Sequence, residues 1–320
     1  MNPAEATKPR VVVAGTLPAA GLDLLRDRYT VEAHGARADG AWLRNHAPGA
    51  TAIVADPTIP VDAPLLDLVG DSLKVVSNFG VGYDNIDVAA VRARGVRATN
   101  TPGVLTNATA ELAVTLMLAA ARRISEGDAI VRRGEWRGWG AEEFLGRELA
   151  GATVGLVGFG RIARRVTELI RGFDVRLLFT ARSYQVSRYG AEQRDLDDLL
   201  GCSDFISVHV PLTPDTRHLI DARALARIKC GAILVNTSRG SVVDENALIA
   251  ALRSGRVAAA GLDVYEDEPH VSARLRELPN TVLLPHVGSA TRSTRDAMAR
   301  LCAENVIAAI EGREPPAAVV

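Results

Sequence analysis

Three residues in the last third of the chain carry side chains that could act together on a 2-oxo acid: Arg239, Glu268 and His286. Histidine can donate a proton near neutral pH, because its charge changes in that range. Glutamate can hydrogen-bond the second ring nitrogen and favour the protonated imidazole. Arginine can clamp a carboxylate and polarise the adjoining carbonyl group. Together with a hydride donor, this set could reduce the acid.

Polar residues follow five apolar runs that are typical of buried parallel strands. The runs lead into Arg182, His209, the segment 236–240, Asp263 and the segment 285–288. In an open parallel sheet, ligands bind beyond the carboxyl ends of the strands. Any one of these groups could be a structural polar residue at a strand end. Because five of them fall at the same edge, we expect a single site there.

A glycine-rich loop, Gly158-Phe159-Gly160-Arg161-Ile162-Ala163, is the candidate site for the hydride donor. It follows the apolar run 153–157 and precedes apolar residues at helical spacing, as in a dinucleotide fingerprint. The glycines allow a tight turn and let backbone amides approach a pyrophosphate at the positive end of the helix. Ala163 replaces the third glycine, at a position that needs only a small residue. The loop predicts a nicotinamide dinucleotide; the alternative is an ordinary glycine-rich turn.

The strand after this loop indicates which dinucleotide binds. NAD-binding units end this strand in an Asp or Glu, about 20 residues past the loop, which binds the ribose hydroxyls. Here the strand leads into Thr180-Ala181-Arg182-Ser183, which has no carboxylate. Arg182 and Ser183 offer a guanidinium and a hydroxyl group that suit a 2′-phosphate. We therefore predict NADP(H) in preference to NAD(H); the alternative is that Arg182 is a solvated surface charge.

Two series of β-type runs alternate with helical patterns and predict two α/β domains with doubly wound parallel sheets. The runs cover 11–14, 52–55, 73–76 and 96–98, then 153–157, 175–179, 205–208, 232–235, 259–262 and 281–284. A long apolar helix over 107–122 joins the series. An amphipathic segment over 291–310 follows them, and we expect it to pack on the first domain. The predicted domains are residues 1–101 with 289–320, and residues 102–288.

Composition and charge give no indication of nucleic acid, membrane or metal partners. The formal net charge of −1 at pH 7 gives no reason to expect nucleic acid or an anionic membrane. No apolar run approaches the length of a membrane helix, and the polar leader Met1–Arg10 lacks the apolar centre of a signal peptide. We expect a cytoplasmic protein. The three cysteines are far apart and form no metal-type pattern, so we expect them to be reduced and buried, and we expect no metal site.

The motifs together resemble the D-isomer-specific 2-hydroxyacid dehydrogenase family over nearly the whole chain. The segments that carry the resemblance are VGLVGFGRI at 154–162, VNTSRG at 235–240, GLDVYEDEP at 261–269 and LPHVG at 284–288. The resemblance implies a flavodoxin-like substrate domain, a Rossmann dinucleotide domain and an active-site cleft between them. It makes Arg239 the substrate-binding arginine, Glu268 the partner of the histidine and His286 the acid/base.

The resemblance also implies the other binding residues. Asp263 and the Thr237 region would hold the nicotinamide end, and Val210, Pro211 and Thr216 would line the adenosine side. Thr109, Gly288 and Ser289 would be further cofactor contacts. NFGVGYD at 78–84 is similar to the family's substrate loop, in which the amides of Val81 and Gly82 bind the carboxylate. A plain glycine turn is the alternative for that loop.

The pattern is closest to that of glyoxylate/hydroxypyruvate reductases. RGEWRGW at 133–139 resembles their segment in which a tryptophan from the partner subunit closes the pocket, which would make Trp139 that residue and the protein a homodimer. The predicted function is NADPH-dependent reduction of glyoxylate or hydroxypyruvate. Two alternatives stay open: a dehydrogenase for a larger or phosphorylated D-2-hydroxy acid, and a non-catalytic dinucleotide-sensing scaffold like the corepressors built on this fold.

Overall fold

Two parallel sheets organise the chain in this computed structural model, which describes residues 8–320. A five-stranded sheet belongs to the first domain, formed by the chain up to Leu105 together with Ser289–Val320. A seven-stranded sheet belongs to the second domain, Thr106–Gly288. Every strand pair in both sheets is parallel. The predicted fold class, two α/β domains with parallel sheets, is confirmed.

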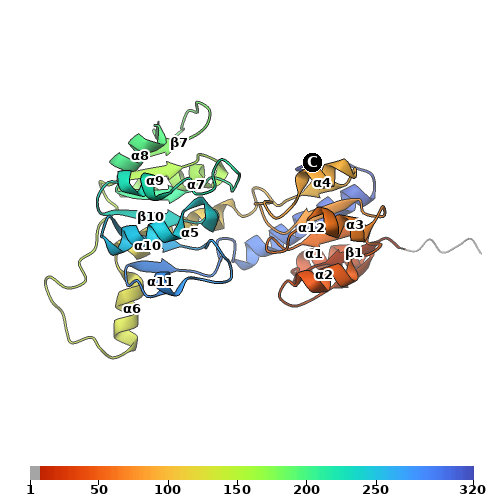
Figure 1. The fold of residues 1–320 in the computed structure, drawn as a ribbon, viewed down its shortest axis with the longest axis horizontal. Coiled ribbons are helices and arrows are strands. Elements are labelled where there is room, and N and C mark those ends of the chain that lie inside the picture. The colour runs from red at the N-terminus through yellow and green to blue at the C-terminus, as the bar shows by residue number, and fades with distance from the viewer. Residues whose placement is uncertain (1–7) are drawn as a thin grey trace, which may run out of the picture. The chain divides into compact units, whose positions relative to one another are not determined.

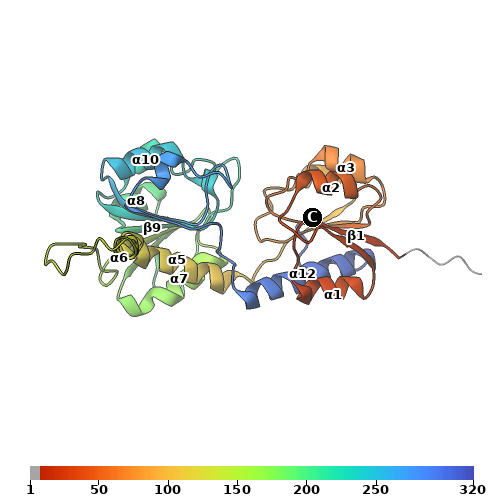
Figure 2. The same cartoon turned by 90° about the horizontal axis from the view of Figure 1, so that it is seen from below.

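The first domain has the strand order β2-β1-β3-β4-β5. Its strands are β1 (Arg10–Val13), β2 (Thr30–Ala33), β3 (Ala52–Ala55), β4 (Val75–Asn78) and β5 (Arg97–Thr99). Its helices are α1 (Ala19–Arg26), α2 (Gly40–His46), α3 (Ala63–Val69), α4 (Val88–Ala93) and α12 (Arg292–Ile310). Helices α1 and α12 cover one face of the sheet, and α2 and α3 cover the other (Figure 2). Strands β3 and β4 are buried along their whole length, because helices cover both of their faces.

Helix α12 packs on the first domain, as the sequence predicted. It begins after Thr291, whose side chain accepts a hydrogen bond from the amide of Thr294 and so caps the helix. Helix α1 approaches it closely at Gly21, where an added Cβ would lie 2.2 Å from the carbonyl oxygen of Ala299. This close packing ties the last helix of the chain to the first.

The second domain has the strand order β12-β11-β10-β9-β6-β7-β8. Its strands are β6 (Thr153–Val157), β7 (Arg176–Thr180), β8 (Glu192–Gln193), β9 (Phe205–Val208), β10 (Ala232–Asn236), β11 (Val257–Leu262) and β12 (Thr281–Leu283). Its helices are α5 (Thr106–Ala121), α6 (Ile124–Arg132), α7 (Arg161–Leu169), α8 (Leu196–Cys202), α9 (Ala222–Arg227), α10 (Glu245–Arg253) and α11 (Ala273–Arg276), with short 3₁₀ turns at Ile170–Phe173 and Gly240–Val242. Helices α5 and α7 lie on one side of the sheet, and α8 and α10 on the other (Figure 2).

The structure differs from the sequence predictions in two respects. Strands β2 and β8 were not predicted; both lie at sheet edges, where partial exposure removes the apolar signal of a buried strand. Cys302 is buried, but Cys202 and Cys230 are exposed, so the expectation that all three cysteines are buried was wrong. Each exposed cysteine lies at the end of a helix or next to a turn, where the chain returns to the surface.

Among the described helices, none combines the length and apolar character needed to cross a bilayer. The polar leader considered above lies mostly outside the described residues, which begin at Lys8.

Candidate active site

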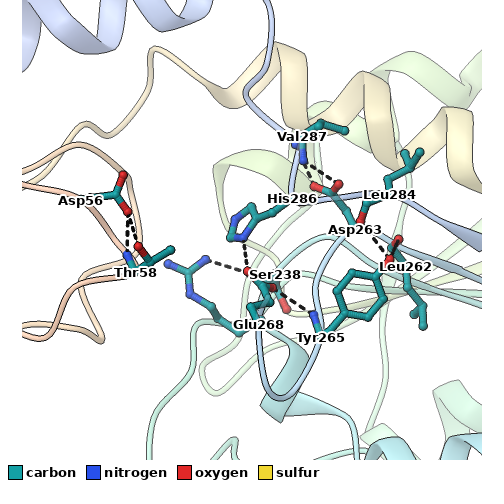
Figure 3. A network of polar contacts seen from close by, with 12 residues as sticks. Asp56, Thr58, Ser238, Leu262, Asp263, Tyr265, Glu268, Leu284, His286 and Val287 are labelled. Atoms are coloured by element: carbon teal, nitrogen blue, oxygen red, sulfur yellow. Dashed lines mark hydrogen bonds and ion pairs between the residues drawn. The ribbon is translucent and has the colours of Figure 1, made fainter. Parts of the chain in front are cut away.

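His286 and Glu268 form a direct pair at the carboxyl edge of the second domain's sheet (Figure 3). The ring nitrogen Nδ1 of His286 lies 2.7 Å from Oε2 of Glu268. The other carboxylate oxygen, Oε1, accepts a hydrogen bond of 3.0 Å from the amide of Tyr265. Burial favours the neutral form of Glu268, but the hydrogen bond and charge of His286, with the Tyr265 amide and the charge of Arg239, outweigh it and hold the pKa of Glu268 below its usual value. The glutamate is therefore an anion beside the imidazole.

The backbone that carries His286 is held by Asp263. The carboxylate of Asp263 accepts hydrogen bonds of 2.7 Å from the amides of Val287 and Gly288, and its carbonyl oxygen accepts one of 2.9 Å from the amide of His286. Burial raises the pKa of Asp263, whose side chain is almost completely enclosed. His286 adopts a positive φ of 55°, a conformation that a non-glycine residue needs surrounding contacts to maintain. Asp263 thus fixes the turn that presents the imidazole.

Arg239 follows β10 on a turn built by Asn236. The side-chain oxygen of Asn236 accepts hydrogen bonds from the amide and hydroxyl of Ser238, and its Nδ2 donates to the carbonyl of Arg239 at 2.9 Å. The guanidinium donates to the carbonyl of Ser238 at 2.9 Å. Its charge contributes to the lowered pKa of Glu268.

Gly240 explains how the loops after β10 and β11 come so close. A Cβ at Gly240 would lie 1.8 Å from the carbonyl carbon of Tyr265 and 2.4 Å from the amide nitrogen of Glu266, so no side chain fits there. The contact brings Arg239 and Glu268 together from neighbouring strands. The structure therefore assembles all three residues singled out for catalysis.

The glycine loop between β6 and α7 has the form that a dinucleotide requires. Gly158 has a positive φ of 94°, and a Cβ there would lie 2.7 Å from Cγ1 of Val210, so glycine is needed at this turn. Gly160 precedes Arg161 and Ile162 at the start of α7, and its position faces open space. No side chain caps α7, so its first amides and positive dipole end are available to a phosphate. Ala163 is fully buried, which explains the small residue.

Buried polar atoms without partners lie beside this loop. Among the described residues, Oγ1 of Thr237 and Nε2 of His209 find no hydrogen-bond partner. They follow β10 and β9, which pair through Asn236 and Val208, so the two side chains stand one residue beyond a registered pair. Burial lowers the pKa of His209 to about 4, so its ring is neutral near pH 7. Buried donors and acceptors are normally satisfied, and a bound dinucleotide would satisfy these.

Arg182 and Ser183 lie on the loop after β7, at the same carboxyl edge. Both side chains are exposed. Gln193 of β8 holds this loop from behind, because its Nε2 donates to the carbonyls of Ala181 and Ser183 at 3.2 and 3.1 Å. The loop is thus fixed while the Arg182 guanidinium faces solvent.

The remaining predicted cofactor residues fall into two groups. Val210, Pro211 and Thr216 form one loop after β9, in which Oγ1 of Thr216 donates to the carbonyl of Pro211 at 2.6 Å. Thr109 of α5 donates from its hydroxyl to the carbonyl of Gly288 at 3.2 Å, next to the turn held by Asp263. Ser289 is the first residue of the returning first-domain segment, and its carbonyl accepts from the amide of Thr291 at 2.9 Å.

The predicted substrate residues lie on two other segments of the chain. Val81 and Gly82 lie on the loop after β4 in the first domain and are partly exposed. Trp139 lies in the segment after α6 and is 87% exposed. That segment projects from the rest of the second domain (Figure 1), and its base meets the start of β12 rather than the carboxyl edge. Within one chain, the structure does not bring Trp139 to the catalytic group.

Three contributors lie in the segments quoted above but were given no role there: Asn236, Gly240 and Tyr265. Tyr265 supplies the amide for Glu268, and its hydroxyl donates to the carbonyl of Leu284 at 2.9 Å, which ties the loops after β11 and β12 together. Burial, together with the charges of Asp263 and Glu268, raises the pKa of Tyr265 to about 12. Asn236 and Gly240 flank Arg239 in the sequence, and an Asn with a Gly in one turn was a usable signal.

Comparisons with known proteins agree with this geometry. Residues 114–288 match the family described as D-isomer specific 2-hydroxyacid dehydrogenase, NAD binding domain. A glyoxylate reductase from Thermococcus litoralis is 44% identical over 326 residues, covering 97% of this chain and 96% of that protein.

Solved structures are similar to this chain over nearly its whole length. A protein from Thermus thermophilus superposes with a TM-score of 0.91 at 44% identity, covering 97% of this chain and 100% of that chain. An NADPH-dependent glyoxylate/hydroxypyruvate reductase from Sinorhizobium meliloti, in complex with NADP and malonate, superposes with a TM-score of 0.87 at 34% identity. That match covers 98% of this chain and 97% of the reductase.

Proposed function

Because the chain belongs to the D-isomer-specific 2-hydroxyacid dehydrogenase family, we propose that it reduces glyoxylate and hydroxypyruvate with NADPH. Membership makes the chain an oxidoreductase that uses a nicotinamide dinucleotide. The observation that carries the proposal is the 2.7 Å contact between His286 and an ionised Glu268, with Arg239 in the same group. These groups match the needs of a small 2-oxo acid: a proton for the carbonyl oxygen and a cation for the carboxylate.

His286 is the proposed proton donor. Its Nδ1 is engaged by Glu268, so Nε2 is the nitrogen that can face the substrate. The contact with Glu268 fixes the direction in which Nε2 points. When the proton leaves Nε2 for the carbonyl oxygen, the ring becomes neutral and the alkoxide charge does not accumulate. The bound dinucleotide supplies the hydride that the carbonyl carbon accepts.

Arg239 is the proposed clamp for the substrate carboxylate, together with the amides of Val81 and Gly82. Its guanidinium can make two parallel hydrogen bonds to a carboxylate, which also orients the adjoining carbonyl group. The turn built by Asn236 and the absence of a side chain at Gly240 hold the arginine backbone in place.

The nicotinamide dinucleotide has a proposed place along the carboxyl edge of the second domain. The uncapped start of α7 would hold the pyrophosphate, and the unpartnered Thr237 hydroxyl and Thr109 lie toward the catalytic end. Arg182 and Ser183 are the proposed contacts of the 2′-phosphate, because no carboxylate follows β7 and the guanidinium is exposed. The preference for NADPH rests on these two residues.

The substrate proposal is tested by a panel of 2-oxo acids assayed with the purified protein and NADPH. We expect glyoxylate and hydroxypyruvate to have the highest kcat/KM. A tenfold advantage for phenylpyruvate or another bulky or phosphorylated acid would assign the chain to a different substrate class within the family.

The cofactor proposal is tested by the Michaelis constants for NADPH and NADH. Replacing Arg182 with Ala should raise the constant for NADPH about tenfold, the cost of one charge-assisted contact, and leave that for NADH unchanged. Arg188→Ala, an exposed arginine on the same loop, is the matched control and should change neither constant. A tenfold preference of the unaltered protein for NADH contradicts the proposal.

We also propose that the protein is a homodimer. Helix α6 and the residues up to 147 expose several large apolar side chains: Ile124, Val131, Trp136, Trp139 and Leu145. A cavity of about 420 Å³ lies at the base of this segment and is lined by Ala119, Arg123, Leu145, Ala259 and Val282 among others. Several exposed large apolar side chains in one segment are typical of an interface, and a second copy would cover them. In such a dimer, Trp139 is the proposed contribution to the partner's substrate pocket.

A further inference from the structure

Three consecutive carbonyl groups in the loop after β4 are each held by a hydrogen-bond donor from a strand end. The carbonyl of Gly80 accepts from the amide of Thr101 at 3.0 Å. The carbonyl of Val81 accepts from Nδ2 of Asn100 at 2.7 Å, and that of Gly82 from Nδ2 of Asn78 at 2.6 Å. Asn78 ends β4, while Asn100 and Thr101 follow β5. The carbonyls therefore face the end of the sheet.

The direction of each carbonyl fixes the direction of the next amide. In a planar trans peptide, the C=O and N–H bonds point in opposite directions. The amides of Val81, Gly82 and Tyr83 therefore point away from the strand ends. Within residues 8–320, none of the three donates a hydrogen bond to another group of the chain. Three adjacent amides with one outward direction suit the binding of an anion.

The two asparagines are themselves held in one orientation. Nδ2 of Asn85 donates to Oδ1 of Asn78 at 3.2 Å, which leaves the Nδ2 of Asn78 for the carbonyl of Gly82. Nδ2 of Asn305 in α12 donates to the backbone carbonyl of Asn100 at 3.1 Å. Asn78 and Asn305 are fully buried, and Asn100 is 8% exposed. Side chains so enclosed have no freedom to release the carbonyls.

Gly80 allows the same loop to pack closely against Pro57. A Cβ at Gly80 would lie 2.7 Å from Cγ of Pro57, so the loop approaches its neighbour more closely than a larger residue permits. The loop is thus confined by Pro57 and held through its carbonyls by the two strand ends.

We propose that Asn78 and Asn100 are positioning residues that aim a row of three amides, from Val81, Gly82 and Tyr83, at the substrate carboxylate. The inference rests on the proposed function and deepens it in two ways. It adds Tyr83 as a third donor, and it assigns the specificity for a carboxylate to two buried amide side chains that never touch the substrate.

The test uses one variant of a positioning asparagine and one variant of an amide donor. Glyoxylate is the substrate, and oxalate is an unreactive competitor. Asn100→Asp replaces the donor that holds the Val81 carbonyl by an oxygen that repels it. We expect KM for glyoxylate and the inhibition constant of oxalate to rise together by about tenfold or more, because a charged hydrogen bond is misdirected. The kcat and the KM for NADPH should stay within about threefold, since binding of the carboxylate is equal in the ground and transition states.

Tyr83→Pro examines the third amide without touching either asparagine, because proline has no N–H group. Tyr83→Ala is its matched control, since it removes the exposed side chain and keeps the amide. We expect weaker oxalate binding for the proline variant alone. This pair keeps the inference testable if Asn100→Asp fails to fold.

Two results would overturn the inference. One is a folded Asn100→Asp protein with a lowered unfolding temperature but unchanged KM and oxalate affinity, which would mark a purely structural role. The other is equal oxalate binding by both Tyr83 variants. Neither result affects turnover of glyoxylate by the unaltered protein, whose absence would instead refute the proposed function.

Discussion

The ionised carboxylate of Glu268 contributes to the stability of the fold as well as to the proposed chemistry of the site. Its pKa is lowered in the folded protein by His286, the Tyr265 amide and Arg239, against the opposing effect of burial. A carboxyl group whose pKa is lower in the folded than in the unfolded state stabilises the protein at any pH above the unfolded value. That stabilisation disappears as the pH falls through the folded value, where both states become protonated.

Glu268→Gln should therefore change the dependence of stability on pH. We expect the variant to be less stable than the unaltered protein at pH 7, with a difference that shrinks as the pH falls below about 4.3, the ordinary pKa of a glutamate. Chemical unfolding at several pH values measures this. Glu277→Gln, at the exposed end of α11, is the control. A difference that stays constant with pH contradicts the ionised pair.

Sequence alone could identify the chemical groups but not the residues that aim them. Arg239, Glu268 and His286 stand after strands, in motifs whose order is informative. Asn78, Asn100 and Tyr265 act through contacts with residues whose positions depend on how strands and loops pack. A buried asparagine at a strand end has many structural uses, so its type does not reveal its partner.

At the scale of elements, the site depends on how closely the loops after β10 and β11 approach each other. Gly240 lies against the backbone of Tyr265, and backbone atoms cannot move aside as a flexible side chain can. Tyr265 in turn connects the loop after β11 to the end of β12. A displacement at this contact reaches Arg239, Glu268 and His286 together.

Gly240→Ala adds only one methyl group, but it should impair catalysis strongly because the added Cβ would meet the backbone of Tyr265. We expect the loop to shift, kcat/KM for glyoxylate to fall by about 10²-fold, and stability to fall by about 1–3 kcal/mol. Gly172→Ala, where a Cβ meets no atom within 4 Å, is the control and should be neutral. Kinetics and thermal unfolding of the two variants decide the matter; wild-type activity in Gly240→Ala would show that the loops tolerate separation.

The predicted elements agree with the structure where strands are buried and fail at the edges. The runs 153–157 and 205–208 coincide with β6 and β9, because central parallel strands are apolar on both faces. Strand β2 contains Thr30 and Glu32 and is half exposed, and β8 has only two residues. Such strands are defined by pairing with a neighbour, which depends on tertiary structure and not on local composition.

At the scale of the whole molecule, the segment 124–147 is the feature that a single chain leaves unexplained. Its apolar side chains face solvent, and Trp139 has no role within its own chain. A second copy of the chain would bury this surface.

Sedimentation analysis should find a dimer for the unaltered protein. Replacing the exposed Val131 and Trp136 with Asp and Arg should produce monomers, because charges cannot be buried without partners. Leu68→Asp, an exposed apolar residue of the first domain, is the control and should leave the dimer intact. A monomeric unaltered protein at micromolar concentration contradicts the proposed dimer.

The most direct test of the central claim is the steady-state reduction of glyoxylate by NADPH, measured for the unaltered protein and for His286→Ala. The account predicts turnover by the unaltered protein and a loss of about 10²- to 10⁴-fold in kcat for the variant, the usual contribution of a general acid, with NADPH binding unchanged. A folded His286→Ala protein that keeps kcat within a factor of about three would show that another group donates the proton, and would contradict the account.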